Sequence, residues 1–235
     1  MKAIETPSRL DPDAAKRILE KARDTCELSQ RLDQISAEFL GSAYQEGSLG
    51  GGAALNEEFR IDLKVFDCVT LIEVVLALAL ARSLEEFIDK TRRIRYVDGR
   101  IDWFHRNHYM VDWARNNEQS GFVRNVTSGQ FTAEKTCTLN LIEGLETRTV
   151  QFSYFASEQL TAAADLMQHG DIIFFVSTRQ DLDVFHSGFV FERGGRIILR
   201  HATRRAGLVI DQDLDEFVSQ NQMAGTVLLR PICLT

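Results

Sequence analysis

The chain has 235 residues, of which 44% are hydrophobic, so it is long enough to bury one substantial core with at most a smaller helical addition. Its formal net charge of −7 argues against a nucleic-acid-binding protein, because phosphate binding requires a basic patch or stripe. The cysteines are widely scattered and show no CxxC spacing, so the sequence predicts neither a zinc site nor a disulfide framework.

The beginning of the sequence lacks an apolar stretch of the length that a secretory signal requires, so no leader is expected in the chain as given. The longest apolar stretch, residues 69–80, includes Glu73 and is too short and too polar for a transmembrane segment. A soluble protein is therefore expected. The oligomeric state is left open.

Helices are predicted for the first part of the chain. Asp11 and Pro12 supply a cap and a first-turn proline for a helix through about residue 24, and a second helix is expected over about 28–41. Both patterns are amphipathic, which predicts an N-terminal helical layer, residues 1–54, packed on a core domain of residues 55–235. The glycine-rich segment 44–52 is expected to be a loop, because it lacks the Lys and Ser/Thr of a P-loop.

The next elements alternate between strand and helix. Residues 59–63 alternate like a strand, Asp67-Cys68 opens the apolar helix, and Ser83 begins a further helix that runs toward Arg95. A polar and aromatic stretch, 96–109, leads into a helix over about 109–117.

Strand patterns dominate from residue 122 onward. They are predicted over 122–126, 135–142, 147–152, 170–176, 181–191, 197–203, 207–210 and 225–229, with helical intervals over about 157–166 and 214–219. The turn at Gly194-Gly195 predicts a hairpin of the strands 181–191 and 197–203. Because helices come first and strands follow, the fold class is predicted to be α+β with an antiparallel sheet.

Cys68 is the candidate nucleophile, because a thiol at a helix N-terminus is next to backbone N–H groups that favour thiolate and can stabilise an oxyanion. The alternative is a buried structural cysteine, which is the common role of this residue type. The predicted hairpin brings in His186, the candidate general base, and His201, the candidate orienting group. Asp183 competes with His201 for the orienting role, but strand alternation places it on the opposite face from His186.

The motif context resembles the NlpC-type papain-like cell-wall peptidases. The resembling segments, in chain order, are Asp67-Cys68 at a helix start, Gly170-Asp171-Ile172-Ile173-Phe174, His186-Ser187-Gly188-Phe189-Val190 and Leu199-Arg200-His201-Ala202. This resemblance implies a papain-like core in which the helix bearing the nucleophile Cys68 packs on an antiparallel sheet bearing the base His186 and the third polar residue His201.

Within that superfamily the chain is similar to the N-acetylmuramoyl-L-alanine amidase-like branch, from about Leu55 to the C-terminus. The similar segments are Phe66–Glu73, Leu76–Ala79, Ile94–Tyr96 with Asp98-Gly99, and Arg106–Tyr109 with Asp112-Trp113. The similarity implies hydrolysis of the amide between N-acetylmuramic acid and L-alanine in peptidoglycan or released muropeptides, with no metal and no cofactor. The substrate-binding residues that we expect are Asp67, Tyr96, Arg106, His108 and Tyr109, with Asp67 also interpreted as a helix cap.

Two departures concern specificity. Val69-Thr70 follow the Asp-Cys pair where general NlpC enzymes usually have Ser-Gly, and a long insertion, about 96–155, separates Cys68 from His186. Both put the usual stem-peptide specificity in doubt and favour a different substrate pocket.

Three other functions remain open at the level of sequence. A stem-peptide endopeptidase and a noncatalytic muropeptide-binding protein would use the same scaffold. A zinc hydrolase would use His105, His108 and Asp112 on one helix face, but the HExxH arrangement is missing. A leaderless chain fits recycling in the cytoplasm, whereas the similar proteins suggest the cell envelope, so both compartments stay open.

Overall fold

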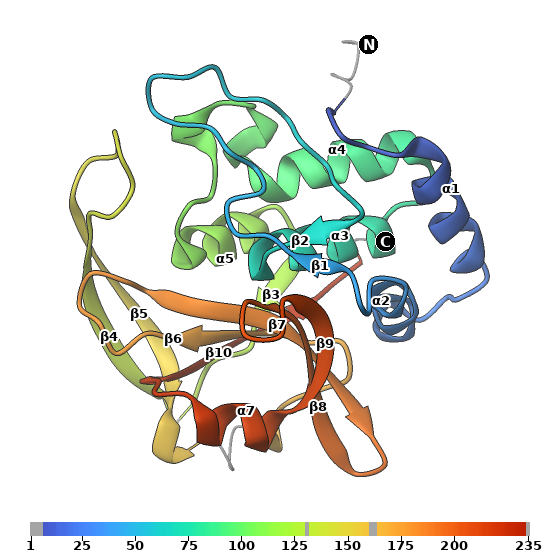
Figure 1. Cartoon of the computed structure of the whole chain (residues 1–235). Coiled ribbons are helices and arrows are strands. Elements are labelled where there is room, and N and C mark those ends of the chain that lie inside the picture. The colour runs from blue at the N-terminus through green and yellow to red at the C-terminus, as the bar shows by residue number, and fades with distance from the viewer. Residues whose placement is uncertain (1–6, 130–131, 160–163, 234–235) are drawn as a thin grey trace. The chain divides into compact units, whose positions relative to one another are not determined.

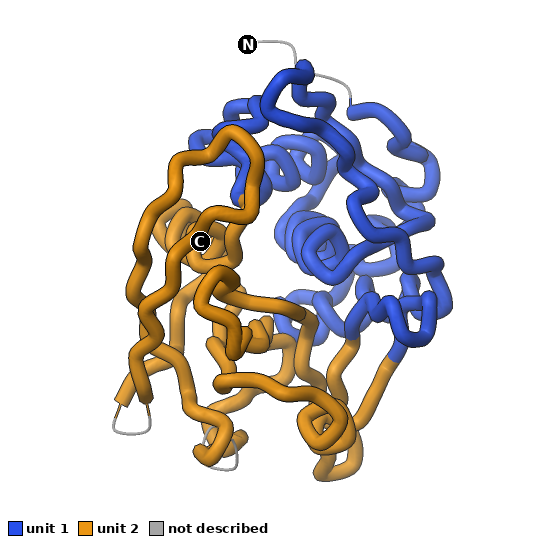
Figure 2. The backbone as a smooth tube through the Cα atoms, turned by 60° about the vertical axis from the view of Figure 1, so that its left-hand side comes forward, with its two compact units in different colours: residues 1–107, 201–210 blue, residues 108–200, 211–235 orange. Residues whose placement is uncertain are grey.

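The computed structural model describes residues 7–129, 132–159 and 164–233, and the fold is a mixed α+β fold with a mostly antiparallel sheet. The chain forms two compact units (Figure 2). The first unit comprises Met1–Asn107 with His201–Ile210, and the second comprises His108–Arg200 with Asp211–Thr235. The predicted domain boundary at residue 54 stays a prediction.

The first unit contains most of the helices and a small group of strands (Figure 1). Its elements are α1 (Pro12–Lys21), α2 (Leu28–Ala37), β1 (Ala43–Tyr44), β2 (Val65–Phe66), α3 (Cys68–Leu80), α4 (Leu84–Arg95), and the 3-10 turns η1 (Val97–Gly99) and η2 (Trp103–His105). Two further strands, β8 (Arg196–Thr203) and β9 (Leu208–Asp213), have residues in both units. The strand order is β2-β1-β9, and β1 pairs parallel with β2 and antiparallel with β9.

Helix α3 is apolar except for a few positions such as Glu73, which fits its position among other helices. Residues 70–79 are all buried, and α1, α2 and α4 pack against the helix. The predicted starts of α1 and α4 are confirmed by their caps: Asp11 accepts a bond from Ala14 N at 2.9 Å, and Ser83 Oγ accepts one from Glu86 N at 3.2 Å. None of the helices in the described ranges has the length and hydropathy that crossing a membrane requires.

The strand predicted over residues 59–63 is wrong. The alternation is present in the burial, since Phe59, Ile61 and Leu63 are buried, but the backbone pairs only with Ser8. A single bridge residue offers no ladder, so the segment stays irregular. The short strand of this region is β2 instead, and only the helix cap Asp67 separates it from Cys68.

The second unit is built on antiparallel strands. Its elements are α5 (Met110–Gln119), β3 (Val123–Asn125), β4 (Thr132–Leu139), β5 (Arg148–Ala156), η3 (Ser157–Gln159), β6 (Ile172–Val176), β7 (Val184–Arg193), α7 (Leu214–Gln220) and β10 (Gly225–Pro231). The strand order is β8-β7-β6-β10-β5-β4, and β3 pairs with β10. The helix predicted around 157–166 lies partly outside the described residues.

Helices α5 and α7 cover opposite faces of this sheet (Figure 1). Successive residues of β6 point to opposite sides. Phe174 meets Trp113 of α5 with ring centroids 5.7 Å apart, whereas Phe175 meets Phe217 of α7 at 4.4 Å. A side chain of β6 or β7 can therefore be assigned to the α5 face or the α7 face.

The predicted hairpin of β7 and β8 is confirmed. The two strands pair from Phe189↔Arg200 to Arg193↔Arg196. The turn residues Gly194 and Gly195 have φ angles of 57° and 79°. Both lie in the left-handed region that a two-residue hairpin turn requires and that glycine adopts without strain.

Candidate functional site

Cys68 is the first residue of α3, and its side chain is half-buried. Asp67 precedes it as the N-cap: its Oδ1 accepts bonds from Val69 N at 3.1 Å and from Thr70 N at 2.8 Å. Thr70 completes a capping box, because its Oγ1 accepts a hydrogen bond from Asp67 N at 2.9 Å. The geometry thus gives Asp67 the role of helix cap, which was one of its two interpretations.

The other free cysteines lie in different environments. Cys26 and Cys233 are exposed, whereas Cys137 is buried and its burial raises the pKa of the thiol. Cys68 alone among the described cysteines combines partial exposure with the N-terminus of a helix longer than eight residues. This is the environment in which a reactive thiol is expected.

Tyr44 is a neighbour of Cys68 that sequence reasoning missed. It pairs with Phe66 across the parallel strands β1 and β2. Burial raises the pKa of the Tyr44 phenol, and negative charge at Cys68, Glu46 and Asp67 raises it further. The phenol therefore keeps its proton at neutral pH. No local pattern around Tyr44 indicates this, because the pairing of two-residue strands is a tertiary feature.

The predicted substrate-binding residues Tyr96 and Arg106 both bind Glu57. The Tyr96 hydroxyl donates to Glu57 Oε1 at 2.7 Å, and Arg106 Nε donates to the same oxygen at 2.8 Å. Arg106 also donates to the carbonyl of Gly50 at 2.9 Å, and its guanidinium lies over the Trp103 ring. Tyr96 is only 1% exposed, and Arg106 is the one of the two that bonds to the glycine-rich loop.

The other two predicted substrate contacts differ in exposure. His108 is half-buried. Tyr109 is buried, and its hydroxyl oxygen accepts a bond from Leu141 N at 2.8 Å, just after β4. Contact of either residue with substrate stays a prediction.

The secondary structure contradicts the alternative of a zinc site built from one helix face. His105 belongs to η2 and its Nδ1 lies 3.0 Å from Asp102 Oδ1, whereas α5 begins only at Met110. His105, His108 and Asp112 therefore do not share a helix face. Among the described residues no group of three His, Cys, Asp or Glu side chains is arranged to hold a metal ion.

His186 lies in β7 next to an irregularity of the sheet. Phe175 pairs with His186 and Val176 pairs with Val184, so Phe185 is an extra residue, a β-bulge. The half-buried imidazole stacks on Phe175, with centroids 6.2 Å apart, and on Phe217 of α7 at 5.4 Å. The ring of His186 thus belongs to the α7 face of the sheet.

Asp183 lies on the other face. Its carboxylate accepts a bond from Val111 N of α5 at 2.9 Å, and burial raises its pKa. Strand alternation also predicts that Asp183 and His186 lie on opposite faces. In the structure this placement has another cause, because β7 begins only at Val184 and the bulge interrupts the alternation. Asp183 is engaged with α5 and is not a partner for the His186 ring.

His201 is fully buried near the end of β8. Its neighbour Arg200 forms a bidentate ion pair with Asp211 of β9, with Nε–Oδ1 at 2.6 Å and Nη2–Oδ2 at 2.7 Å. Such a planar pair fixes orientation as well as distance. Cys68 and His201 belong to the first unit and His186 to the second.

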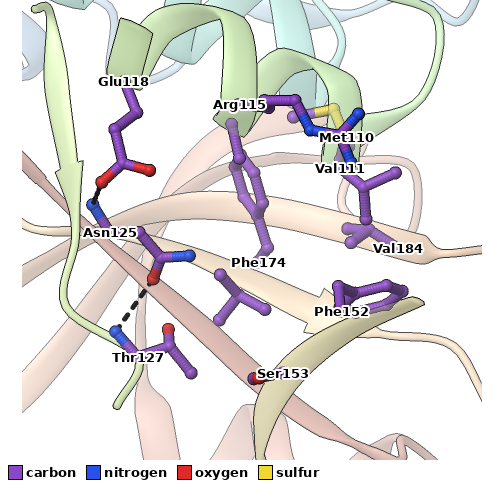
Figure 3. A pocket seen from close by; sticks show the side chains of 12 residues that line it. Met110, Val111, Arg115, Glu118, Asn125, Thr127, Phe152, Ser153, Phe174 and Val184 are labelled. Atoms are coloured by element: carbon purple, nitrogen blue, oxygen red, sulfur yellow. Dashed lines mark hydrogen bonds between the residues drawn. The ribbon is translucent and has the colours of Figure 1, made fainter. Parts of the chain in front are cut away.

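The second unit also contains a pocket of about 250 Å³ (Figure 3). Its walls come from α5, from the segment around β3 and from β5, and its floor includes Phe174, Val184 and Val227. At one end Glu118 accepts a bond from Asn125 N at 2.8 Å. The pocket lies on the α5 face, whereas the His186 ring lies on the α7 face, so His186 does not line it.

A family model and several solved structures are similar to this chain. The family model described as N-acetylmuramoyl-L-alanine amidase-like matches residues 34–226. A structure of an N-acetylmuramoyl-L-alanine amidase from Bacteroides uniformis is similar, with 25% identity and a TM-score of 0.78 over 87% of this chain and 99% of that chain. A Legionella pneumophila protein has the same fold, with 24% identity and a TM-score of 0.80 over 94% and 97% of the two chains.

No curated protein matches the chain significantly. The family model nevertheless covers most of the sequence, including the segments that carry Cys68, His186 and His201. The chain therefore belongs to the N-acetylmuramoyl-L-alanine amidase-like family.

Proposed function

We propose that this protein is a cysteine amidase that cleaves the bond between N-acetylmuramic acid and L-alanine in peptidoglycan fragments. The family supports this choice of substrate, because its name specifies this amide bond. The observation that carries the mechanism is the half-buried thiol of Cys68 at the N-terminus of α3. The proposal needs no metal and no cofactor.

The reaction begins with the transfer of the Cys68 proton to His186. The thiolate attacks the carbonyl carbon of the muramyl lactyl group, and the positive end of the α3 dipole stabilises the resulting oxyanion. The His186 imidazolium then protonates the nitrogen of L-alanine as the C–N bond breaks, which leaves a thioester on Cys68. His186 next removes a proton from water, and the hydroxide releases the muramyl carboxylate and the free thiol.

Two further residues assist this sequence. His201 bonds to the second ring nitrogen of His186 and fixes its tautomer. Tyr44 supplies a neutral hydroxyl near the sulfur, because its raised pKa keeps it protonated, and this hydroxyl donates to the oxyanion.

Product analysis on defined muropeptides tests the proposal. Mass spectrometry should find the intact stem peptide, beginning with a free L-alanine amine, together with the free muramyl sugar acid. Cleavage within the stem peptide would identify an endopeptidase, and binding without any product would identify a noncatalytic muropeptide-binding protein.

Substitutions test the mechanism separately from the substrate. Cys68→Ala and His186→Ala should each abolish hydrolysis with the fold intact, whereas His201→Ala should retain part of the activity because water can replace an orienting group. Cys26→Ala is the matched control and should hydrolyse like the wild type. Substantial activity of Cys68→Ala would overturn the cysteine mechanism.

A further inference from the structure

Lys135 occupies a position in β4 that the strand pattern assigns to an apolar residue. The inward-facing row of this strand is Lys135, Cys137 and Leu139, and all three are buried, while Thr136 and Thr138 between them are exposed. A buried lysine requires partners, because a charged group loses its hydration there. Burial accordingly lowers the pKa of Lys135.

The Lys135 ammonium donates to three backbone carbonyls of one loop. The loop is residues 177–183, which connect β6 to β7, and the acceptors are the carbonyl oxygens of Ser177, Arg179 and Leu182. The bonds to Arg179 and Leu182 are 2.8 Å long. An ammonium has three donors, so its whole bonding capacity is directed to this loop.

Other bonds close the same loop from several sides. Ser177 N donates to the carbonyl of Asp183 at 2.9 Å, which joins the two ends of the loop. Thr138 N, three residues after Lys135, donates to the carbonyl of Gln180 at 2.8 Å. The Asp183 carboxylate holds α5 through Val111 N. Within the described residues, Lys135 is the one side chain of β4 that forms hydrogen bonds to this loop.

The loop ends where the bulge of β7 begins. The pair Val176↔Val184 is the first strand pair next to the closed loop. The extra residue Phe185 then separates Val184 from His186. A shift of one residue in strand pairing turns side chains to the other face of a sheet. The conformation of loop 177–183 therefore decides how the chain enters the bulge and how the imidazole meets Phe217.

We propose that Lys135 is a positioning residue for His186: it holds loop 177–183 so that the bulge keeps the imidazole stacked on Phe175 and Phe217. The kinetic part of this proposal rests on the function proposed above, in which His186 is the general base. The structural part concerns residues of the second unit only. Lys135 itself touches no reacting atom.

The experiment compares Lys135→Met, which keeps the length of the side chain but has no donor, with Lys135→Arg. Glu134→Gln is the matched control, because it removes a charge from the exposed face of the same strand. For Lys135→Met we expect kcat to fall about 10- to 100-fold, since misplacing a reacting group by about 1 Å costs up to that much. KM should change less than about threefold, because the variant leaves substrate binding intact.

The ring proton signals of His186 in nuclear magnetic resonance spectra report its position without any substrate. They are assigned by their loss in His186→Asn. In Lys135→Met they should move away from the wild-type values, because the imidazole leaves the ring-current fields of Phe175 and Phe217, and in Glu134→Gln they should not move. Unchanged signals in a folded Lys135→Met protein would overturn the proposal.

Failure of the proposed function and failure of the Lys135 proposal give different results. If the wild type hydrolyses no muropeptide, the amidase proposal fails and the His186 signals alone decide the role of Lys135. If Lys135→Met does not fold, Lys135→Arg decides, because a planar guanidinium cannot direct three donors to the same three carbonyls. Wild-type kcat and wild-type signals in Lys135→Arg would then contradict the proposal.

Discussion

Two groups with opposing effects meet at the first turn of α3. The N–H groups and the dipole of the helix favour a thiolate on Cys68. The capping carboxylate of Asp67, bonded to Val69 N and Thr70 N, brings a negative charge that opposes it. The helix end alone is therefore a weak activator, and the proposed mechanism assigns the larger part of the activation to His186.

Substitution of the cap tests its structural role. Asp67→Ala removes the acceptor for Val69 N and Thr70 N and should lower the free energy of unfolding by about 1 kcal/mol. Asp67→Asn keeps a good cap acceptor and should lie within about 0.5 kcal/mol of the wild type. Urea denaturation measures both. Equal stability of Asp67→Ala and the wild type would show that the cap does not stabilise α3.

The stability of the protein in alkali should depend on Tyr96. Burial raises the pKa of its phenol above the ordinary value of about 10. Above pH 10 the unfolded chain therefore loses this proton before the folded chain does, and the free energy of unfolding falls as pH rises, by up to about 1.4 kcal/mol per pH unit. Below about pH 9 Tyr96 contributes no pH dependence.

Tyr96→Phe removes the titrating group and should make the loss of stability above pH 10 less steep. Urea unfolding at pH 8 and pH 10.5 measures the difference. The variant also loses the hydrogen bond to Glu57, so each protein is compared with itself at the lower pH. Parallel curves for the two proteins would rule out Tyr96 as the source of the alkaline instability.

At the scale of elements, a buried ion pair joins helices α3 and α4 of the first unit. Arg95 of α4 donates through Nε to Glu73 of α3 at 2.7 Å, and both side chains are at most 2% exposed. Arg95 also donates to the carbonyl of Arg60. Removing one partner of such a pair leaves an uncompensated charge in the core, which costs more than losing the whole pair.

Arg95→Met should accordingly lower the free energy of unfolding by about 3–5 kcal/mol. The double variant Glu73→Leu/Arg95→Met should recover a large part of that loss, because no buried charge remains. Chemical denaturation of the wild type, the single variant and the double variant gives the comparison. A double variant less stable than the single one would contradict this account of the α3–α4 contact.

The sequence predicts a helix or a hairpin well where a single capping hydrogen bond or a single turn fixes its position. The caps Asp11, Asp67 and Ser83 and the Gly194-Gly195 turn each determine an element by themselves. The strand expected at 59–63 fails because a strand needs a partner that local alternation cannot indicate. The bulge at Phe185 was not predicted for the same reason, since strand register depends on bonds to other elements.

The candidate site follows the same rule. Cys68 and Asp67 could be predicted because a helix start is visible in a few consecutive residues. Tyr44 and Glu57 could not, because the first depends on the pairing of β1 with β2 and the second on side chains about forty residues away. The predicted hairpin singled out His186 and His201, and the family resemblance then connected them to Cys68, which no local pattern could do.

At the scale of the whole molecule, the proposed chemistry draws on both units. Cys68 and His201 come from the first unit, whereas His186 and the loop bound by Lys135 come from the second. A change in the second unit should therefore alter the reactivity of a thiol in the first. This dependence is the central claim of the proposed mechanism.

The pH dependence of alkylation at Cys68 tests that claim most directly. Iodoacetamide should modify Cys68 near pH 6 much faster than Cys26, and the apparent pKa of its thiol should lie well below the free value of about 8.5. In His186→Ala the apparent pKa should return toward that value. A wild-type Cys68 that reacts no faster than Cys26, or a profile that His186→Ala leaves unchanged, would contradict the mechanism.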